Sequence, residues 1–434
     1  MKANEILPHS DVINIMDDYY GVSSSIPELP QPKTIKHQKQ KKAKKKLTIL
    51  IATFWDFPHT GGLSNYISNL RDGLQEKGHK VDVISPNQFP TSVVASLKKE
   101  VESALNRFFR KRYKTVSKKI LQHARLLFIY EHMLAQHKNI GTYDVYHAQD
   151  IFTANALGRL IGEKKKPIFY TPHGMFTSNR LRFNRIEKGS IEEVYYSHME
   201  KKAIQYSDEI IILGDSFRKP LMELGARKEK MLTIPTGIEF NATLAKSDKS
   251  SSNKLTITII SRLGPRKGHS VFFKALSLIK GSIENVEVLI VGDGEMRSQL
   301  EKQVKESKLS NVTFLGKRED IPDLLARTDI FVLPTLNDTL PISIMEAMHS
   351  KVAIISTTSG SIPEMIKHSE TGLLVAPGDV QALSNALKKF IQQSNERKKV
   401  AKAAYQYAKQ NFSRERMVHD IEARYHDHVG GDNR

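Results

Sequence analysis

The stretch Pro334-Thr-Leu-Asn-Asp-Thr-Leu-Pro-Ile-Ser-Ile-Met-Glu-Ala-Met348 decides the fold of this chain. It directly follows Asp329-Ile-Phe-Val-Leu333, an apolar run of the length typical of a buried parallel strand. Pro341 suits the first turn of a helix, where the N–H that proline lacks has no partner anyway. We therefore predict strand, loop and helix, with Asp338 and Glu346 at the strand's carboxyl end, where open α/β sheets bind ligands. The alternative is a helix start at which Asp338 only favours the helix dipole.

Apolar strand runs and helical segments alternate along the chain in two blocks. The first block begins at Leu47-Thr-Ile-Leu-Ile-Ala-Thr53 and the second at Leu255-Thr-Ile-Thr-Ile-Ile260, after a polar, Ser-rich segment. Two such blocks predict an α/β protein of two doubly wound, Rossmann-like domains with a ligand cleft between their sheet edges. The predicted parts are a disordered Lys-rich tail at 1–46, an N-terminal domain at 47–240, a C-terminal domain at 241–412, and a terminal helix at 413–434 that packs back across the first domain.

The amino-acid composition narrows the class of protein. Hydrophobic residues make up 39% and charged residues 26% of the 434 residues, as in globular proteins with buried cores. Cysteine is absent, which excludes disulfides, thiolate metal sites and a cysteine nucleophile, and fits a reducing compartment. Because the first ten residues also lack the apolar core of a secretory signal, we expect a cytoplasmic protein.

Two segments concentrate the formal net charge of +19. The block Lys33–Lys46 holds eight lysines and no acid, and the stretch Lys98–Arg125, inside a helix predicted over 95–138, holds ten Lys or Arg and two Glu. Such segments favour an anionic membrane surface or an acidic polymer, which would place the protein at the inner face of a membrane. A solvated tail and an ordinary amphipathic helix are the alternatives. Nucleic acid is not expected, because the lysine block has no interleaved aromatic residues and no nucleic-acid motif is present.

Two turns of the first block are candidate ligand sites. Gly61-Gly62 follows the first strand and opens a helix predicted at Leu63–Glu76, so the backbone can approach an anionic group there. A tight turn without ligand is the alternative, and the pattern is not that of a dinucleotide fold. His173 follows the strand Pro167–Thr171, where an imidazole can donate to a substrate hydroxyl or stabilise developing charge. A structural histidine is the alternative.

The first turn of the second block carries two cations. Arg262 and Lys267 lie in Ser261-Arg-Leu-Gly-Pro-Arg-Lys-Gly268, directly after a predicted strand. Arginine offers a bidentate fork and lysine a point charge, which together suit a diphosphate. Glu346, predicted at a neighbouring helix start, suits the hydroxyls of a ribose.

With these segments the second half resembles the nucleotide-sugar-binding domain of the family-four retaining glycosyltransferases of GT-B fold. The segments that carry the resemblance are Ser261–Gly268, Val291-Gly-Asp-Gly294, Phe314-Leu-Gly316, Asp338-x₂-Pro341-x₄-Glu346-Ala347 and Glu370-Thr-Gly-Leu-Leu374. The first half resembles the family through Gly61-Gly62 and His173-Gly174. The resemblance extends over roughly 47–428.

The resemblance implies a role for each matching residue. Arg262 and Lys267 would bind the donor diphosphate, Glu346 the ribose, and Gly316 the base. Gly62 would approach the donor phosphate or the acceptor, and His173 would contact the transferred sugar. Asp338-Thr339 stands where the family usually has Glu-Gly, so the acid is one methylene shorter and a permissive glycine is missing.

The expected activity is transfer of a hexose from a nucleotide diphosphate sugar, with retention at the anomeric carbon, to an unidentified acceptor such as a cell-envelope or surface glycoconjugate. No metal or other cofactor is expected, because Arg262 and Lys267 would neutralise the leaving diphosphate. The string His426-Asp-His428 in the terminal helix is expected at the surface. The competing hypothesis is a catalytically weak protein of GT-B fold that binds an anionic glycopolymer.

Overall fold

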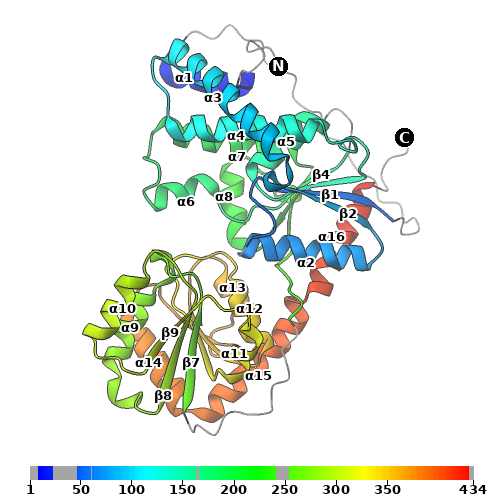
Figure 1. Ribbon diagram of the computed structural model, residues 1–434. Coiled ribbons are helices and arrows are strands. Elements are labelled where there is room, and N and C mark those ends of the chain that lie inside the picture. The colour runs from blue at the N-terminus through cyan, green and yellow to red at the C-terminus, as the bar shows by residue number, and fades with distance from the viewer. Residues whose placement is uncertain (1–7, 23–45, 60, 163–165, 241–253, 430–434) are drawn as a thin grey trace. The chain divides into compact units, whose positions relative to one another are not determined.

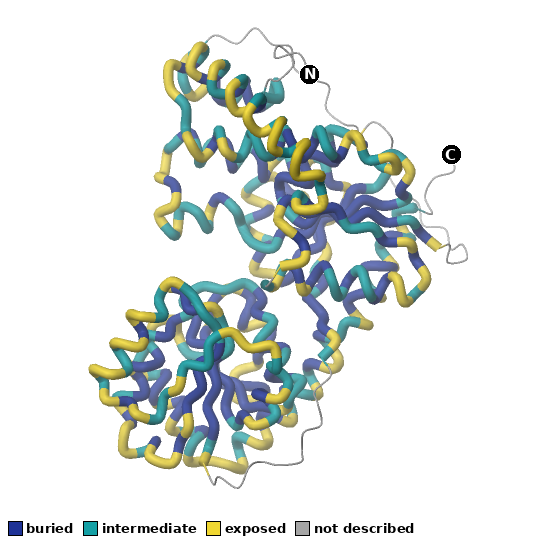
Figure 2. The backbone as a smooth tube through the Cα atoms, viewed as in Figure 1, coloured by how far each residue is buried: buried dark blue, intermediate teal, exposed yellow. Residues whose placement is uncertain are grey.

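The apolar runs of both blocks form parallel strands. A computed structural model describes residues 8–22, 46–59, 61–162, 166–240 and 254–429. These residues fall into two units: those within Met1–Leu213, Phe217–Ile234 and Val418–Arg434, and those within Gly214–Ser216 and Pro235–Met417. Figure 1 shows one sheet in each unit, and Figure 2 shows that the inner strands of each sheet are buried along most of their lengths. Burial on both faces explains why these strands are apolar runs instead of alternating patterns.

The first unit contains a six-stranded parallel sheet in the order β2-β1-β3-β4-β5-β6. Its strands are β1 (Thr48–Ala52), β2 (Lys80–Ile84), β3 (Val145–Ala148), β4 (Ile168–Tyr170), β5 (Glu209–Ile212) and β6 (Met231–Thr233). Its larger helices are α2 (Gly62–Glu76), α3 (Thr91–Tyr113), α4 (Lys118–Ala135), α5 (Ile151–Ile161), α6 (Phe176–Arg182), α7 (Ile191–Tyr206) and α8 (Arg218–Glu223). Figure 1 shows α2 on one face of this sheet and α4, α5 and α7 on the other, as in a doubly wound domain.

The second unit repeats this architecture with the order β12-β11-β10-β7-β8-β9. Its strands are β7 (Leu255–Ile260), β8 (Val286–Val291), β9 (Val312–Gly316), β10 (Ile330–Leu333), β11 (Ala353–Thr357) and β12 (Leu373–Val375). Its helices are α9 (His269–Leu278), α10 (Arg297–Glu306), α11 (Ile321–Arg327), α12 (Ile342–His349), α13 (Ile362–Met365), α14 (Val380–Gln392) and α15 (Ser394–Asn411). The strand order reverses between β7 and β10, which makes that point of the sheet edge a topological switch point.

The last helix, α16 (Arg414–Val429), joins the first unit from Val418 onward. A Cβ added to Gly73 of α2 would lie 2.5 Å from Cγ2 of Val418, so glycine lets the two helices approach closely. Farther along, the guanidinium of Arg424 pairs with the carboxylate of Glu209 at the start of β5, with Nε 2.8 Å from Oε1. The helix is thus fastened by packing at its start and by charge near its end.

A helix at Ser10–Tyr20, α1, corrects the prediction of a disordered tail over 1–46. It packs Val12, Ile13 and Met16 inward, and its buried Asp17 accepts from Nε of Arg112 at 2.6 Å. The prediction was wrong for these eleven residues because their partner on α3 lies 95 positions away. The lysine block lies outside the described residues except for Lys46.

The helix predicted over 95–138 is two helices, α3 and α4. Lys114 ends α3 in the left-handed region, with φ of 61°, and the Ser117 side chain caps α4 by accepting from the N–H of Ile120. Of the ten basic residues between 98 and 125, eight are exposed. The other two, Arg112 and Arg125, pair with Asp17 and Glu102. The basic stretch therefore covers the second half of α3, the turn at Lys114–Ser117 and the start of α4, and is not one continuous amphipathic helix.

Candidate functional site

The loops after β7 and β10 meet at the switch point of the second sheet. Gly268, with φ of +74°, faces the carbonyl of Pro334 so closely that an added Cβ would lie 1.9 Å from its oxygen. The carbonyl oxygen of Arg266 accepts from the N–H of Leu336 at 2.7 Å and from the hydroxyl of Thr335 at 2.9 Å. Glycine and these cross-loop bonds therefore hold the two candidate segments against each other.

This contact brings Lys267 and Asp338 together as an ion pair between Nζ and Oδ2. Both side chains are about one-fifth exposed, at 22% and 19%. Asp338 is fixed further, because its Oδ1 accepts from the N–H of Thr339 at 3.1 Å and its own N–H donates to Oγ of Ser359 at 3.2 Å. The lysine expected to bind the donor diphosphate and the acid expected to bind the donor sugar are thus paired with each other.

Arg262, in contrast, extends into solvent, with 74% of its side chain exposed. Its Nη2 lies 3.0 Å from Oε2 of Glu295, in the loop after β8. An exposed pair of this kind contributes about 0–1 kcal/mol, so an anionic ligand can compete for the guanidinium. Glu295 was not predicted as a site residue, although it directly follows the Val291–Gly294 segment.

Glu346 is the fifth residue of α12, one turn farther along than the predicted helix start. It is half-buried, and the described part of the chain offers its carboxyl group neither a hydrogen bond nor an ion pair. Burial raises the pKa of Glu346 to about 7. A ligand that donates hydroxyl groups to this carboxyl would favour its charged form.

Gly316 ends β9, two strands from β7 on the side away from β10. Its φ of +69° lies in the left-handed region, and its carbonyl oxygen accepts from the N–H of Gly292 at 2.7 Å. The residues predicted to bind the donor within the second unit therefore occur at the carboxyl ends of β7, β9 and β10.

The predicted residues of the first unit lie at the corresponding edge of its sheet. Gly62 is the first residue of α2, after β1, and His173 follows β4. Nε2 of His173 lies 3.0 Å from Oε1 of Gln149, and the edge of its ring packs against Tyr66. Burial lowers the pKa of His173 to about 3, so the imidazole is neutral at pH 7. Because Nε2–H of the neutral ring donates to the Gln149 oxygen, Nδ1 is left to accept a hydrogen bond from a sugar hydroxyl, and the imidazole supplies no positive charge.

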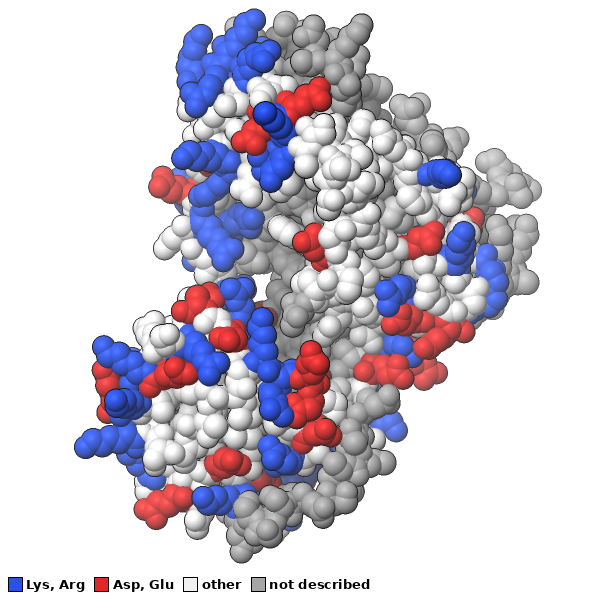
Figure 3. Space-filling model, viewed as in Figure 1, with Lys and Arg blue, Asp and Glu red and all other residues white. Residues whose placement is uncertain are grey.

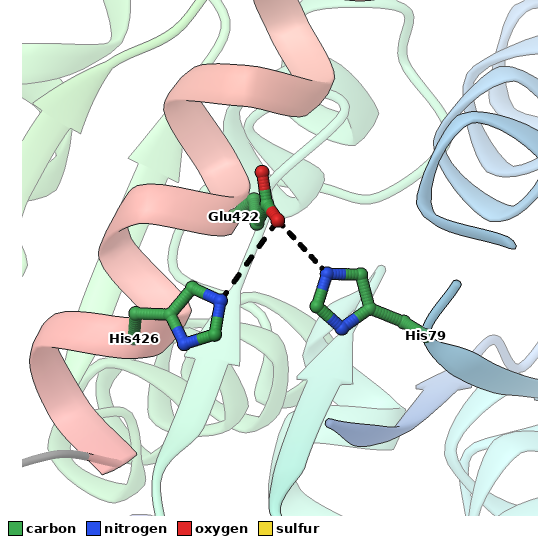
Figure 4. A group of neighbouring side chains, drawn as sticks. All are labelled: His79, Glu422 and His426. Carbon is green, nitrogen blue, oxygen red and sulfur yellow. Dashed lines mark hydrogen bonds and ion pairs between the residues drawn. The ribbon is translucent and has the colours of Figure 1, made fainter. Parts of the chain in front are cut away.

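A group of metal-ligand type lies elsewhere in this unit, where His79 meets Glu422 and His426 of α16 (Figure 4). Nε2 of His79 lies 3.0 Å from Oε1 of Glu422, and Nζ of Lys77 lies 2.7 Å from Oε2. Nδ1 of His79 accepts from the N–H of Leu47, so the proton of a neutral ring is on Nε2, the atom that would have to bind a metal. With an ammonium group on the same carboxylate, the arrangement fits a structural charge network better than a cation site.

The prediction that His426-Asp-His428 lies at the surface was wrong for its two histidines. Both are half-buried, and Nε2 of His428 lies 2.6 Å from Oε2 of Glu209. Their partners come from β5 and from the preceding turn of α16, which the short string itself does not reveal.

None of the helices in the described ranges is both long enough and apolar enough to span a bilayer.

Comparisons with known proteins cover most of the chain. Residues 60–241 match the family model described as Glycosyltransferase Family 4, and residues 241–407 match that of Glycosyl transferases group 1. A similar protein is the amylovoran biosynthesis glycosyltransferase AmsK of Erwinia amylovora, 30% identical over 40% of this chain and 44% of that protein. Another is the UDP-Gal:alpha-D-GlcNAc-diphosphoundecaprenol alpha-1,3-galactosyltransferase of Escherichia coli, 27% identical over 56% and 65%. The chain thus spans less than two thirds of the length of either relative.

A solved structure extends the likeness to nearly the whole fold. The crystal structure of HepE from Anabaena in complex with UDP superimposes with a TM-score of 0.64 over 87% of this chain and 99% of that one, at 19% identity. Both units of this chain are doubly wound domains with parallel six-stranded sheets, as the GT-B fold requires. The predicted fold is confirmed, and the chain belongs to the family-four glycosyltransferases of GT-B fold.

Proposed function

We propose that the protein is a retaining glycosyltransferase that moves a hexose from a nucleotide diphosphate sugar to a lipid-linked glycan acceptor. The observation that carries this proposal is the contact between the loops after β7 and β10, which joins Lys267 to Asp338 at a switch point. The E. coli relative acts on a diphosphoundecaprenol-linked sugar, and HepE binds UDP, which supports a nucleotide donor and a lipid-linked acceptor.

In the proposed reaction the donor diphosphate takes Asp338's place beside Lys267. The carboxylate of Asp338 then becomes free to accept a hydroxyl of the transferred sugar. Arg262 leaves its exposed pair with Glu295 and closes on the same diphosphate as a bidentate donor. Since negative charge grows on the diphosphate as it leaves, both cations bind the transition state more tightly than the ground state.

The remaining site residues orient the donor and the sugar. Glu346 accepts from the ribose hydroxyls, and Gly316 reads the base through its backbone. Neutral His173 accepts at Nδ1 from a hydroxyl of the transferred sugar, while Gly62 allows a phosphate to approach the start of α2. Transfer with retention then proceeds by front-face attack of the acceptor hydroxyl, without a protein nucleophile and without a bound metal.

We also propose that the basic α3–α4 segment, Lys98–Arg125, associates with an anionic membrane surface, where a lipid-linked acceptor resides. Figure 3 shows Lys and Arg side chains gathered over α3 and α4 of the first unit. The exposed basic residues of this segment are Lys98, Lys99, Arg107, Arg110, Lys111, Lys114, Lys118 and Lys119. Each contributes about 1 kcal/mol near an anionic leaflet. Lys33–Lys46 is proposed to add to this attraction.

A donor panel tests the proposed activity. The full chain is incubated with UDP-, GDP- and ADP-hexoses; thermal shift identifies the donor that binds, and proton NMR of the reaction follows the anomeric configuration of the product. We expect one donor class to stabilise the protein and to yield a product that keeps the donor's configuration. Inversion would refute the retaining mechanism. Binding without transfer or hydrolysis would favour the glycopolymer-binding hypothesis instead.

A further inference from the structure

We propose that Arg180 of α6 is the centre of a second anion site, in the first unit, which binds a phosphate of the acceptor. The proposal rests on the proposed function for the identity of the ligand, but the site itself is inferred from the side chains around Arg180. None of the residues given a role in the donor site contributes to it.

Arg180 lies over two aromatic rings, which form a floor beneath its guanidinium. Its Cζ is 3.7 Å from the centre of the Phe176 ring and 5.4 Å from that of Tyr196. The side chain is half-buried, its guanidinium has the Tyr196 side chain as a hydrogen-bond partner, and no acid among the described residues forms an ion pair with it. The rings and the Tyr196 hydroxyl restrict the orientation of the guanidinium while leaving most of its five N–H donors available, which suits a planar, bidentate contact.

The one carboxylate that acts on Arg180 among the described residues, that of Glu200, is already engaged. Glu200 is buried, and its Oε1 accepts from the N–H of Phe176 at 2.7 Å, at the start of α6. Burial lowers the pKa of Arg180 below its usual value, and the nearby Arg185 adds to this, although Tyr196 and, more weakly, the charge of Glu200 act in the opposite direction. Because a guanidinium stays protonated at physiological pH, an anion from outside the chain would relieve this imbalance.

The surroundings of Arg180 add positive charge. Arg185 is exposed, and the ammonium group of Lys119 on α4 donates to its carbonyl oxygen. His123 of α4 lies beside the same floor, with its Nδ1 2.7 Å from the hydroxyl of Tyr196, but burial lowers its pKa to about 4, so this ring is neutral at pH 7 and adds no charge. In Figure 3, Lys and Arg side chains lie over α6 and the adjoining part of α4. The local field therefore favours a ligand with more than one negative charge.

The position of α6 connects this site with the acceptor. The helix begins three residues after His173, at the carboxyl edge of the first sheet. A guanidinium over aromatic rings binds phosphate oxygens through two parallel N–H···O bonds. The diphosphate of the proposed lipid-linked acceptor has this chemistry, whereas a carboxylate sugar carries a single charge.

Calorimetry with inorganic pyrophosphate tests the site in the full chain. Titrations are run with and without saturating UDP, so that the donor site is filled in one arm. The variants are Arg180→Gln, Arg180→Lys and, as matched control, Arg227→Gln, which removes an exposed arginine of the same unit. Thermal unfolding of each variant checks that the fold is retained.

With UDP present we expect the parent chain to bind pyrophosphate and Arg180→Gln to bind it at least tenfold more weakly. Arg180→Lys should fall between them, because it keeps the charge but loses the fork, and Arg227→Gln should match the parent. Equal affinity of Arg180→Gln and the parent would overturn the proposal. Equally tight binding of glucuronate, lost in the same variant, would overturn the assignment to phosphate.

The same titrations separate this proposal from the proposed function. UDP should bind the parent chain and Arg180→Gln equally well. If UDP fails to bind the parent chain while pyrophosphate binding still depends on Arg180, the donor assignment fails and the second anion site stands.

Discussion

Replacing Lys267 by methionine should separate the donor site from the stability of the fold. Methionine keeps most of the length of the side chain and removes only the charge. The ion pair with Asp338 is about one-fifth exposed on either side, and Asp338 keeps the N–H of Thr339 as a partner. The loss of free energy of unfolding should therefore be about 1 kcal/mol or less.

The expected effect on transfer is larger. A charge-assisted contact contributes about 1.5–3 kcal/mol, and each 1.4 kcal/mol is a factor of ten, so kcat/KM should fall about ten- to hundredfold. A larger share of the loss should appear in kcat than in KM, because the leaving diphosphate gains charge in the transition state.

The assay compares transfer kinetics and thermal unfolding of the parent chain, Lys267→Met and the control Lys274→Met. Lys274 is an exposed lysine of α9 in the same unit, so its replacement makes the same change in charge without touching the loop. Parent-level kcat/KM in Lys267→Met would refute the donor role of this lysine. A loss of stability of several kcal/mol would show that the ion pair is structural.

Four further outcomes follow from the same loops and surfaces. Asp338→Asn should lower turnover at least tenfold with little change in the melting temperature; parent-like turnover would leave Asp338 with a merely local role. Burial raises the pKa of Glu346 to about 7, above the ordinary value of 4.5. Between these pH values the folded chain binds more protons at this group than the unfolded chain does, so the free energy of unfolding falls as pH rises from about 4.5 to 7. Glu346→Gln should therefore gain stability relative to the parent across that window, as measured by chemical denaturation at several pH values, and a constant difference would contradict this. Gly268→Ala should destabilise the chain by about 1–3 kcal/mol and weaken nucleotide binding, because φ is +74° and the new Cβ meets the Pro334 carbonyl, whereas Gly281→Ala, with no heavy atom within 4 Å, should not. Sedimentation with vesicles of phosphatidylcholine and phosphatidylglycerol should show salt-sensitive binding that falls when Arg107, Arg110, Lys111 and Lys114 are replaced by glutamine; unchanged sedimentation would remove the basic α3–α4 segment from the proposal.

Local sequence patterns predicted the sheets well, because a strand covered on both faces must be apolar along its length. The runs that became β1, β7, β8 and β10 were visible without any tertiary information. Helices whose apolar residues do not recur with a clear helical period were not predicted. Both α6 and α7 fall in a polar stretch of the chain, and α7 is covered on more than one side, so its apolar residues do not form a single stripe.

Contacts between distant segments were not predictable, since they depend on strand order. Lys267 and Asp338 are 71 residues apart in the sequence, and only the pairing of β7 with β10 brings their loops together. Likewise Arg262 gains Glu295 because β8 lies on the other side of β7. Composition and motif spacing carry no information on either neighbour.

The packing of the loops around Asp338 explains how Asp338-Thr339 can stand where the family usually has Glu-Gly. Thr339 does not adopt a positive φ, so the chain needs no glycine there. Glycines with positive φ occur instead in the neighbouring loops. Gly268 and Gly360 each face a carbonyl of the loop after β10, and a Cβ added to Gly360 would lie 1.8 Å from the carbonyl oxygen of Asp338. Because the loop is held between these two glycines, the shorter carboxylate of Asp338 still reaches Lys267. The substitution therefore leaves the acid beside the lysine proposed to bind the diphosphate, and any change in donor choice should arise from the reach of Asp338 toward the sugar.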